Sequence, residues 1–189
     1  MCEIESKIDY WLNRASSSIF NQGLEWYSST KEWTEDIANQ YNIHQKQVAG
    51  ILAALSPMKE WEYNKKLTVE FLECQNCGHL TNQIAKCRMI YNGYMNDSYI
   101  TTVLSGRKTI SFYDNICYPN ASNLLTVDFR MWNFFKKDEW VHITNKRWDE
   151  MEKVFQDKSK SLNISIPQIQ AILWLQTKNE HGRFSFKGN

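Results

Sequence analysis

A lysine and an aspartate twenty residues apart are the groups in this chain whose types and spacing most strongly suggest chemistry. Lys108 stands in the string Leu104-Ser-Gly-Arg-Lys-Thr109, and Asp128 stands in Thr126-Val-Asp-Phe-Arg-Met-Trp132. A lysine amine can attack a sugar carbon and form a Schiff base. A nearby carboxylate stabilises the positive charge that develops on the sugar when a glycosidic bond breaks. Both residues also have structural interpretations, Asp128 as a helix N-cap and Lys108 as an exposed helical lysine.

Length and composition restrict the class of protein. A chain of 189 residues fits one domain or two closely packed lobes, and 42% hydrophobic residues are enough for a core. No run of eighteen apolar residues exists to span a membrane, and the N-terminus has no apolar signal segment. We therefore expect an intracellular, cytoplasmic protein with no membrane partner.

The net charge of +1 is unevenly distributed along the chain. Residues 1–100 carry a net charge of −3, whereas residues 101–189, which contain Lys108 and Asp128, carry +4. A basic half suits a polyanionic partner such as DNA, although an ordinary solvated surface could produce so small a bias.

Three of the five cysteines lie close to a histidine in the sequence and raise the question of a zinc site. Cys74, Cys77, His79 and Cys87 are the four candidate ligands, and CxxC is a common half-site. Cys87 falls within a predicted helix, where Ile84, Met89 and Ile90 suggest that it packs in the core. We therefore predict free thiols, no metal and no cofactor.

Residue patterns predict helices along most of the chain, and few stretches alternate as strands do. The pattern favours an all-α fold of about eight to ten helices. The first expected helix begins at a capping box, Ser29–Glu32, and another begins at Asp128. The last is opened by Ser165-Ile-Pro-Gln168 and ends at Gly182. The other expected helices cover residues 48–55, 61–72, 83–91, 99–104, 107–117 and 145–160.

Three blocks resemble, in the same order, the helix-hairpin-helix DNA glycosylases, the superfamily of endonuclease III and 8-oxoguanine DNA glycosylase. They are residues 51–64, residues 86–90 and residues 104–132, within a matched region of about 48–135. The resemblance implies a two-lobed all-α fold in a single domain of residues 1–189. It also implies that Lys108 is the nucleophile, that Asp128 stabilises charge, and that both share a pocket between the lobes.

The chain departs from this superfamily at the hairpin. Relatives usually have Leu-Pro-Gly-Val-Gly before the lysine helix, whereas Ser105 and Gly106 lead directly to Arg107 here. The shortened hairpin offers fewer backbone amides to a DNA phosphate, so side chains should contribute more of the contact. Arg130 replaces a histidine often found two residues after the aspartate, and the iron–sulfur cysteine cluster of some members is absent.

The expected DNA contacts follow from the same resemblance. A flipped-out base leaves a gap that a wedge residue fills, and the turn after Leu55 presents Met58 and Lys59 for this role. Trp61 and Trp132 could stack on a base. The predicted nucleic-acid-binding residues are Met58, Lys59, Ser105, Gly106, Arg107, Arg130, Lys136 and Lys137.

A further likeness is to small glycosylase-like proteins of tailed bacteriophages, through the Leu-Ser-Pro turn and the string of residues 112–116. The same broad fold includes phage enzymes of DNA hypermodification, the thymine pyrophosphorylase type. We therefore expect a DNA base glycosylase or glycosylase/lyase, located in the host cytoplasm if the chain is phage-encoded. The alternatives are a hypermodification enzyme that uses the same pocket, and a non-catalytic DNA- or protein-binding module.

Overall fold

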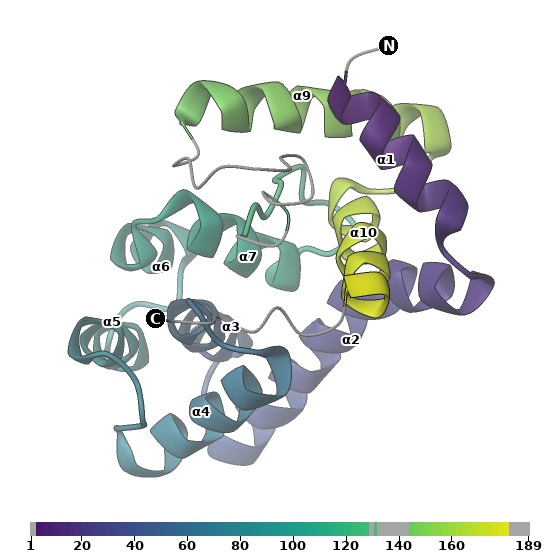
Figure 1. The fold of residues 1–189 in the computed structure, drawn as a ribbon. Helices are drawn as coiled ribbons and strands as arrows, with labels where there is room; N and C mark the ends of the chain where they lie inside the picture. The colour runs from purple at the N-terminus through teal and green to yellow at the C-terminus, as the bar shows by residue number, and fades with distance from the viewer. Residues whose placement is uncertain (1–2, 129–130, 132–143, 182–189) are drawn as a thin grey trace, which may run out of the picture. The chain divides into compact units, whose positions relative to one another are not determined.

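The computed structural model describes residues 3–128, 131 and 144–181, and every regular element in these ranges is an α-helix. The prediction of an all-α protein is therefore confirmed for this part of the chain (Figure 1). The helices are α1 (Glu3–Arg14), α2 (Ser17–Tyr41), α3 (Gln45–Leu55), α4 (Trp61–Cys74), α5 (Thr81–Asn92), α6 (Asp97–Leu104), α7 (Arg107–Cys117), α9 (Asn145–Leu162) and α10 (Ile166–His181).

The chain forms two compact units. Unit 1 comprises Met1–Tyr27 and Asn120–Asn189, and unit 2 comprises Ser28–Pro119. Helix α2 runs through the boundary, so its first turns belong to unit 1 and the rest to unit 2. No helix in the described ranges has both the length and the apolar character that crossing a membrane requires.

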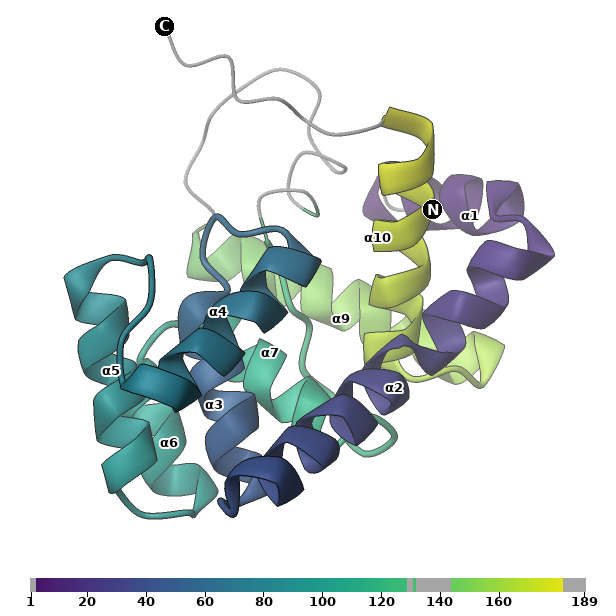
Figure 2. The same cartoon turned by 90° about the horizontal axis from the view of Figure 1, so that it is seen from below.

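Unit 2 is built around α3, which packs against α4, α5, α6 and α7 (Figure 1, Figure 2). Every residue of α3 from Gln47 to Leu55 is buried. A helix that is apolar on all sides is typical of a central position. A Cβ at Gly50 would lie 2.9 Å from Ile100 and 3.2 Å from Ile90, so glycine lets α5 and α6 approach α3 closely. The predicted apolar face is thus confirmed, because Val48, Ile51, Leu52 and Leu55 are all fully buried.

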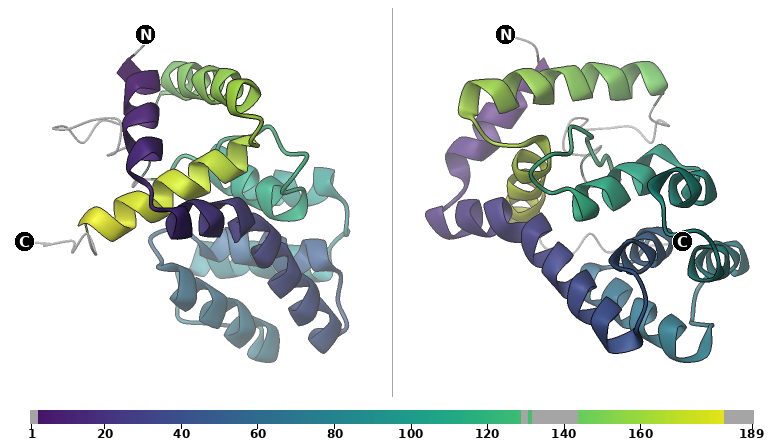
Figure 3. Two further views of the ribbon diagram at one scale, coloured as in Figure 1. Left: turned by 90° about the vertical axis from the view of Figure 1, so that its right-hand side faces the viewer. Right: turned by 180° about the vertical axis from the view of Figure 1, so that it is seen from behind.

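Unit 1 is built from α1, the start of α2, α9 and α10. Figure 3 shows α1 (purple), α9 (light green) and α10 (yellow) beside one another, in agreement with their mutual contacts. Their apolar faces enclose a core to which Leu125, Val127 and Met131 also contribute. Its buried members are Ile8, Leu125, Val127, Met131, Trp148, Met151, Phe155, Ile166, Ile169 and Leu173.

Most of the predicted helix boundaries lie within a few residues of the observed ones, and α7 has the predicted bounds. The Ser165–Gln168 capping box is confirmed, because the Ser165 N–H donates to Gln168 Oε1 at 3.0 Å and the Gln168 N–H donates to Ser165 Oγ at 3.4 Å. Asp128 accepts from the Met131 N–H at 2.8 Å, the hydrogen bond expected of an N-cap, although nearly all of the helix predicted to begin there lies outside the described residues. The predicted helix end at Gly182 lies outside the described residues.

The predicted helix start at Ser29 is wrong, because α2 continues without a break from Ser17 to Tyr41. Ser29 lies in its middle and is exposed. A buried stripe at helical spacing passes straight through the supposed cap, and its members are Gly23, Tyr27, Thr30, Thr34, Ile37 and Ala38. Sustained periodicity outweighs a four-residue capping motif.

Gly23 provides a test of this helix packing. A Cβ at Gly23 would lie 2.7 Å from both the backbone N and the Cα of Ile172 in α10. Alanine normally stabilises a helix interior by about 1 kcal/mol relative to glycine. Here we expect Gly23→Ala to lower the free energy of unfolding by about 1–3 kcal/mol, because a backbone clash cannot be relieved by a rotamer change.

Urea unfolding followed by circular dichroism measures this effect. Gly78→Ala is the matched control, because a Cβ there would have only Tyr63 Oη nearby, at 3.8 Å. Its stability should stay within about 0.5 kcal/mol of the parent. A Gly23→Ala protein as stable as the parent would contradict the packing of α2 on α10.

Candidate functional site

A two-residue turn joins α6 to α7 at the position of the predicted hairpin. Helix α6 ends at Leu104, Ser105 adopts the left-handed conformation with φ of 58°, and extended Gly106 precedes α7. Lys86 Nζ, from α5, donates to Leu104 O at 2.7 Å and to Ser105 Oγ at 3.0 Å. A cation at a helix C-terminus is favourable, so Lys86 fixes the turn from which Arg107 and Lys108 begin α7.

Lys108 reaches from the first turn of α7 to the C-terminal end of α3. Its Nζ donates to Ser56 Oγ at 2.6 Å and lies 5.3 Å from the centroid of the Phe112 ring. Ser56 is the C-cap of α3, and its hydroxyl donates in turn to Ala53 O at 2.9 Å. The Lys108 side chain is therefore half-buried and held in one direction.

Two other side chains form hydrogen bonds with the last carbonyls of α3. Asn64 Nδ2 donates to Leu52 O at 3.1 Å, and His79 Nε2 contacts Leu55 O at 3.1 Å. The last carbonyls of a helix have no partner within the helix, and a buried carbonyl without a hydrogen bond is costly. These side chains replace the water that such carbonyls would otherwise bind.

The turn between α3 and α4 adjoins Lys108 through Ser56. Met58 lies on this turn with φ of 58°, and 85% of its surface is exposed. Lys59 Nζ lies 5.3 Å from the centroid of the Tyr63 ring in α4. Of the predicted site residues, Met58, Lys59 and Lys108 thus come together around Ser56.

The remaining predicted residues are differently placed. Ser105 and Gly106 are exposed on the hairpin turn, and Arg107 is partly buried. Asp128 belongs to unit 1, whereas Lys108 belongs to unit 2. Predicted residues Arg130, Lys136 and Lys137, together with Trp132, lie outside the described residues.

His79 has a structural role that its sequence context does not reveal. The Leu80 N–H donates to His79 Nδ1 at 2.7 Å, so the proton of the neutral ring is on Nε2 and is donated to Leu55 O. Burial, and to a smaller extent the charge of Lys59, lowers the pKa of His79. The imidazole therefore joins the loop after α4 to the end of α3 in its neutral form.

The candidate zinc ligands have other environments. Both His79 nitrogens are engaged, Cys74 is exposed, and Cys77 and Cys87 are buried, with burial raising the pKa of both buried thiols. In the described ranges no three Cys, His, Asp or Glu side chains meet in a way that could hold a metal ion. Cys87 packs in the core as predicted, as do Ile84 and Ile90, although Met89 is exposed.

A polar cluster at the start of α6 was not predicted from the sequence. The Asp97 carboxylate accepts from Lys46 Nζ at 2.8 Å, Tyr113 Oη at 2.6 Å and Tyr118 Oη at 2.7 Å. Burial alone would raise the pKa of Asp97, but the hydrogen bonds from Lys46, Tyr113 and Tyr118 lower it. The cluster joins α3, α6 and the end of α7, and so positions the hairpin that carries Lys108.

The His79 contacts predict how stability depends on pH. Because the folded protein lowers the pKa of His79 below its unfolded value near 6.5, the stabilisation is complete above that pH. It is lost as the pH falls, because protonated Nδ1 can no longer accept from Leu80. We expect His79→Gln to lower the free energy of unfolding by about 0.5–1.5 kcal/mol at pH 7.5, which is the value of one hydrogen bond. On acidification, the free energy of unfolding should fall less in this variant than in the parent.

Urea unfolding midpoints at pH 7.5 and pH 5.5 give both quantities. A variant as stable as the parent at pH 7.5, or one with the same loss of stability on acidification, would show that His79 does not hold α3 in this way.

Comparison with known proteins assigns the chain to a family without assigning a function. No curated protein and no solved structure matches it. The family described as "Family of unknown function (DUF7178)" matches residues 2–181, which include all the helices described above. Since this description names neither DNA nor glycosidic chemistry, the glycosylase resemblance stays a prediction. The chain belongs to the family of unknown function DUF7178.

Proposed function

We propose that this protein is a DNA base glycosylase or glycosylase/lyase-like enzyme, with Lys108 as the nucleophile and Asp128 as the electrostatic stabiliser. The observation that carries the proposal is the position of the Lys108 amine. It lies half-buried beside the turn that bears the exposed Met58 and the partly buried Lys59. A wedge residue and a nucleophile on neighbouring turns suit an enzyme that acts on an extruded base.

The proposed reaction requires Lys108 to leave its contact with Ser56. The neutral amine attacks C1′ of the sugar while the bond from C1′ to the base breaks, and the base departs with the bonding electrons and takes up a proton. Loss of a proton from the attached nitrogen and opening of the sugar ring then give a Schiff base. The Asp128 carboxylate would stabilise positive charge on the sugar during the first step.

A second candidate function is a non-catalytic DNA- or protein-binding module, and one observation favours it. The Lys108 cation lies at the negative end of the α3 dipole and donates to the Ser56 C-cap. A lysine in this position stabilises the fold whether or not it reacts.

Borohydride trapping on an abasic-site duplex separates the two functions. An abasic sugar exposes an aldehyde, an amine condenses with it to an imine and water, and borohydride reduces the imine to a stable amine. We expect the parent to form a covalent protein–DNA adduct. In Lys108→Arg the yield of this adduct should fall by on the order of 100-fold. Arginine keeps a cation beside Ser56 but stays protonated and cannot form the imine.

Two control variants identify the reacting amine. Lys59→Met removes a neighbouring amine, and Ser56→Ala removes the hydrogen-bond partner of Lys108, so both should still be trapped. If the parent forms no adduct, or if Lys108→Arg is trapped as well as the parent, Lys108 is not a Schiff-base nucleophile.

Phosphate contact by the hairpin predicts a change in salt dependence. We expect Arg107→Ala to weaken binding to duplexes of different sequence about equally and to lower the slope of log affinity against log salt by roughly one unit. Lys31→Ala is the matched control, because it removes one positive charge from α2, where Lys31 lies 3.8 Å from Glu35. Undetectable DNA binding at low salt, or equal slopes for all three proteins, would remove the support for a nucleic-acid substrate.

A further inference from the structure

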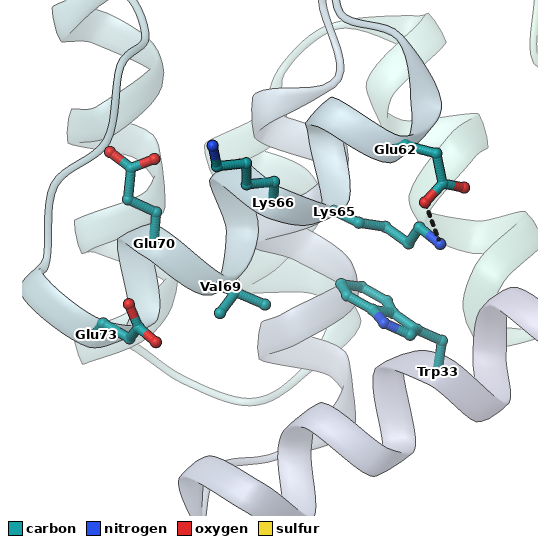
Figure 4. Close-up of a pocket in the computed structure, with 7 residues that line it drawn as sticks. All are labelled: Trp33, Glu62, Lys65, Lys66, Val69, Glu70 and Glu73. Atoms are coloured by element: carbon teal, nitrogen blue, oxygen red, sulfur yellow. Dashed lines mark ion pairs between the residues drawn. The ribbon is translucent and has the colours of Figure 1, made fainter.

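A groove on the surface of unit 2 lies apart from the residues proposed to contact DNA. It has a volume of about 640 Å³ and runs between α2 and α4 (Figure 4). Trp33 of α2 and Val69 of α4 form its apolar part, and the charged lining residues all come from α4. They are Glu62, Lys65, Lys66, Glu70 and Glu73.

One end of the groove is occupied by its own cation. Lys65 Nζ pairs with Glu62 at 2.9 Å and lies 5.9 Å from the Trp33 ring and 5.3 Å from the Trp61 ring. Trp61 also meets Trp33 edge-on, with centroids 6.5 Å apart. These contacts hold the Trp33 indole in place and balance the charge at this end.

The other end carries carboxylates. Glu70 and Glu73 both lie on the side of Val69 away from Trp33 (Figure 4), and in the described part of the chain neither forms an ion pair. Glu73 accepts a hydrogen bond from Tyr41 Oη at 3.3 Å. Lys66 alone offsets these charges within the lining, which leaves this end net negative.

The stability of α4 does not explain these carboxylates. Glu70 and Glu73 lie in the last turns of a helix that ends at Cys74, and its last turn contains no basic residue. The negative end of the helix dipole disfavours acidic side chains there. Their position therefore opposes local stability and is consistent with a role in binding.

We propose that the α2–α4 groove docks a basic segment of a protein partner. An arginine or lysine of that segment lays its aliphatic stem over Val69 and Trp33 and brings its charged head to Glu70 and Glu73. The apolar floor accepts a neighbouring aliphatic side chain. A nucleic acid does not suit this groove, because the carboxylates repel phosphates.

Nuclear magnetic resonance of the tryptophan indole N–H groups tests this docking on the full chain. The eight tryptophans give separate side-chain signals, and Trp33→Phe identifies the one from Trp33. The probe is an acetylated and amidated peptide of sequence Leu-Arg-Leu-Arg-Leu, with Leu-Glu-Leu-Glu-Leu as its charge-reversed counterpart. We expect the basic peptide to shift the Trp33 signal saturably, with weaker binding at high salt, and the acidic peptide to leave it unchanged.

Charge variants identify the residues responsible. The double variant with Glu70→Gln and Glu73→Gln should bind the basic peptide with roughly three- to tenfold lower affinity, as expected for the loss of two partly exposed ion pairs. The control is Glu25→Gln with Glu150→Gln, which makes the same charge change at two exposed sites of unit 1 and should leave affinity unchanged. A Trp33 signal that does not respond to the basic peptide, responds equally to both peptides, or is equally sensitive in the two double variants would overturn the proposal.

Discussion

The need to satisfy the C-terminal carbonyls of α3 governs the arrangement of unit 2. Helix α3 is buried on all sides, so the groups at its end cannot be hydrogen-bonded freely by water. Asn64 of α4 and His79 of the following loop donate to Leu52 and Leu55. Lys108 of α7 donates to the capping hydroxyl of Ser56. Three separate segments are thus fixed by one helix end, and the turn that bears Met58 begins at the same point.

This constraint gives Lys108 a position and also opposes its proposed chemistry. A nucleophilic amine must be neutral, whereas the negative end of a helix dipole and the face of the Phe112 ring both favour the ammonium form. A substrate that draws the amine away from Ser56 would remove these contacts and so favour the neutral form.

Local patterns in the sequence predict those parts of the fold that depend on neighbouring residues. The bounds of α7, the Ser165–Gln168 box and the Asp128 cap all involve residues within a few positions of one another. The contacts of His79 with Leu55 and of Asp97 with Lys46 join residues 24 and 51 positions apart, so no local motif indicates them. The helix start predicted at Ser29 is wrong for a different reason. A complete capping motif is present there, but it lies inside a longer buried stripe at helical spacing, and that stripe determines the structure.

Charge sums over halves of the sequence are likewise a poor guide to surfaces. The first hundred residues are net acidic, yet they supply Lys59 beside the proposed site and Lys86 at the hairpin. The acidic groove comes from the same hundred residues, because α4 follows directly after Lys59 and carries Glu70 and Glu73 near its far end. A single helix thus begins beside the residues proposed to meet DNA and ends beside those proposed to meet a basic protein segment. At a rise of about 1.5 Å per residue, Glu70 lies about 14 Å along α4 from Trp61. Because this exceeds the Debye length of about 8–10 Å, charges bound at the two ends of α4 are largely screened from one another, and the two surfaces should bind their partners independently.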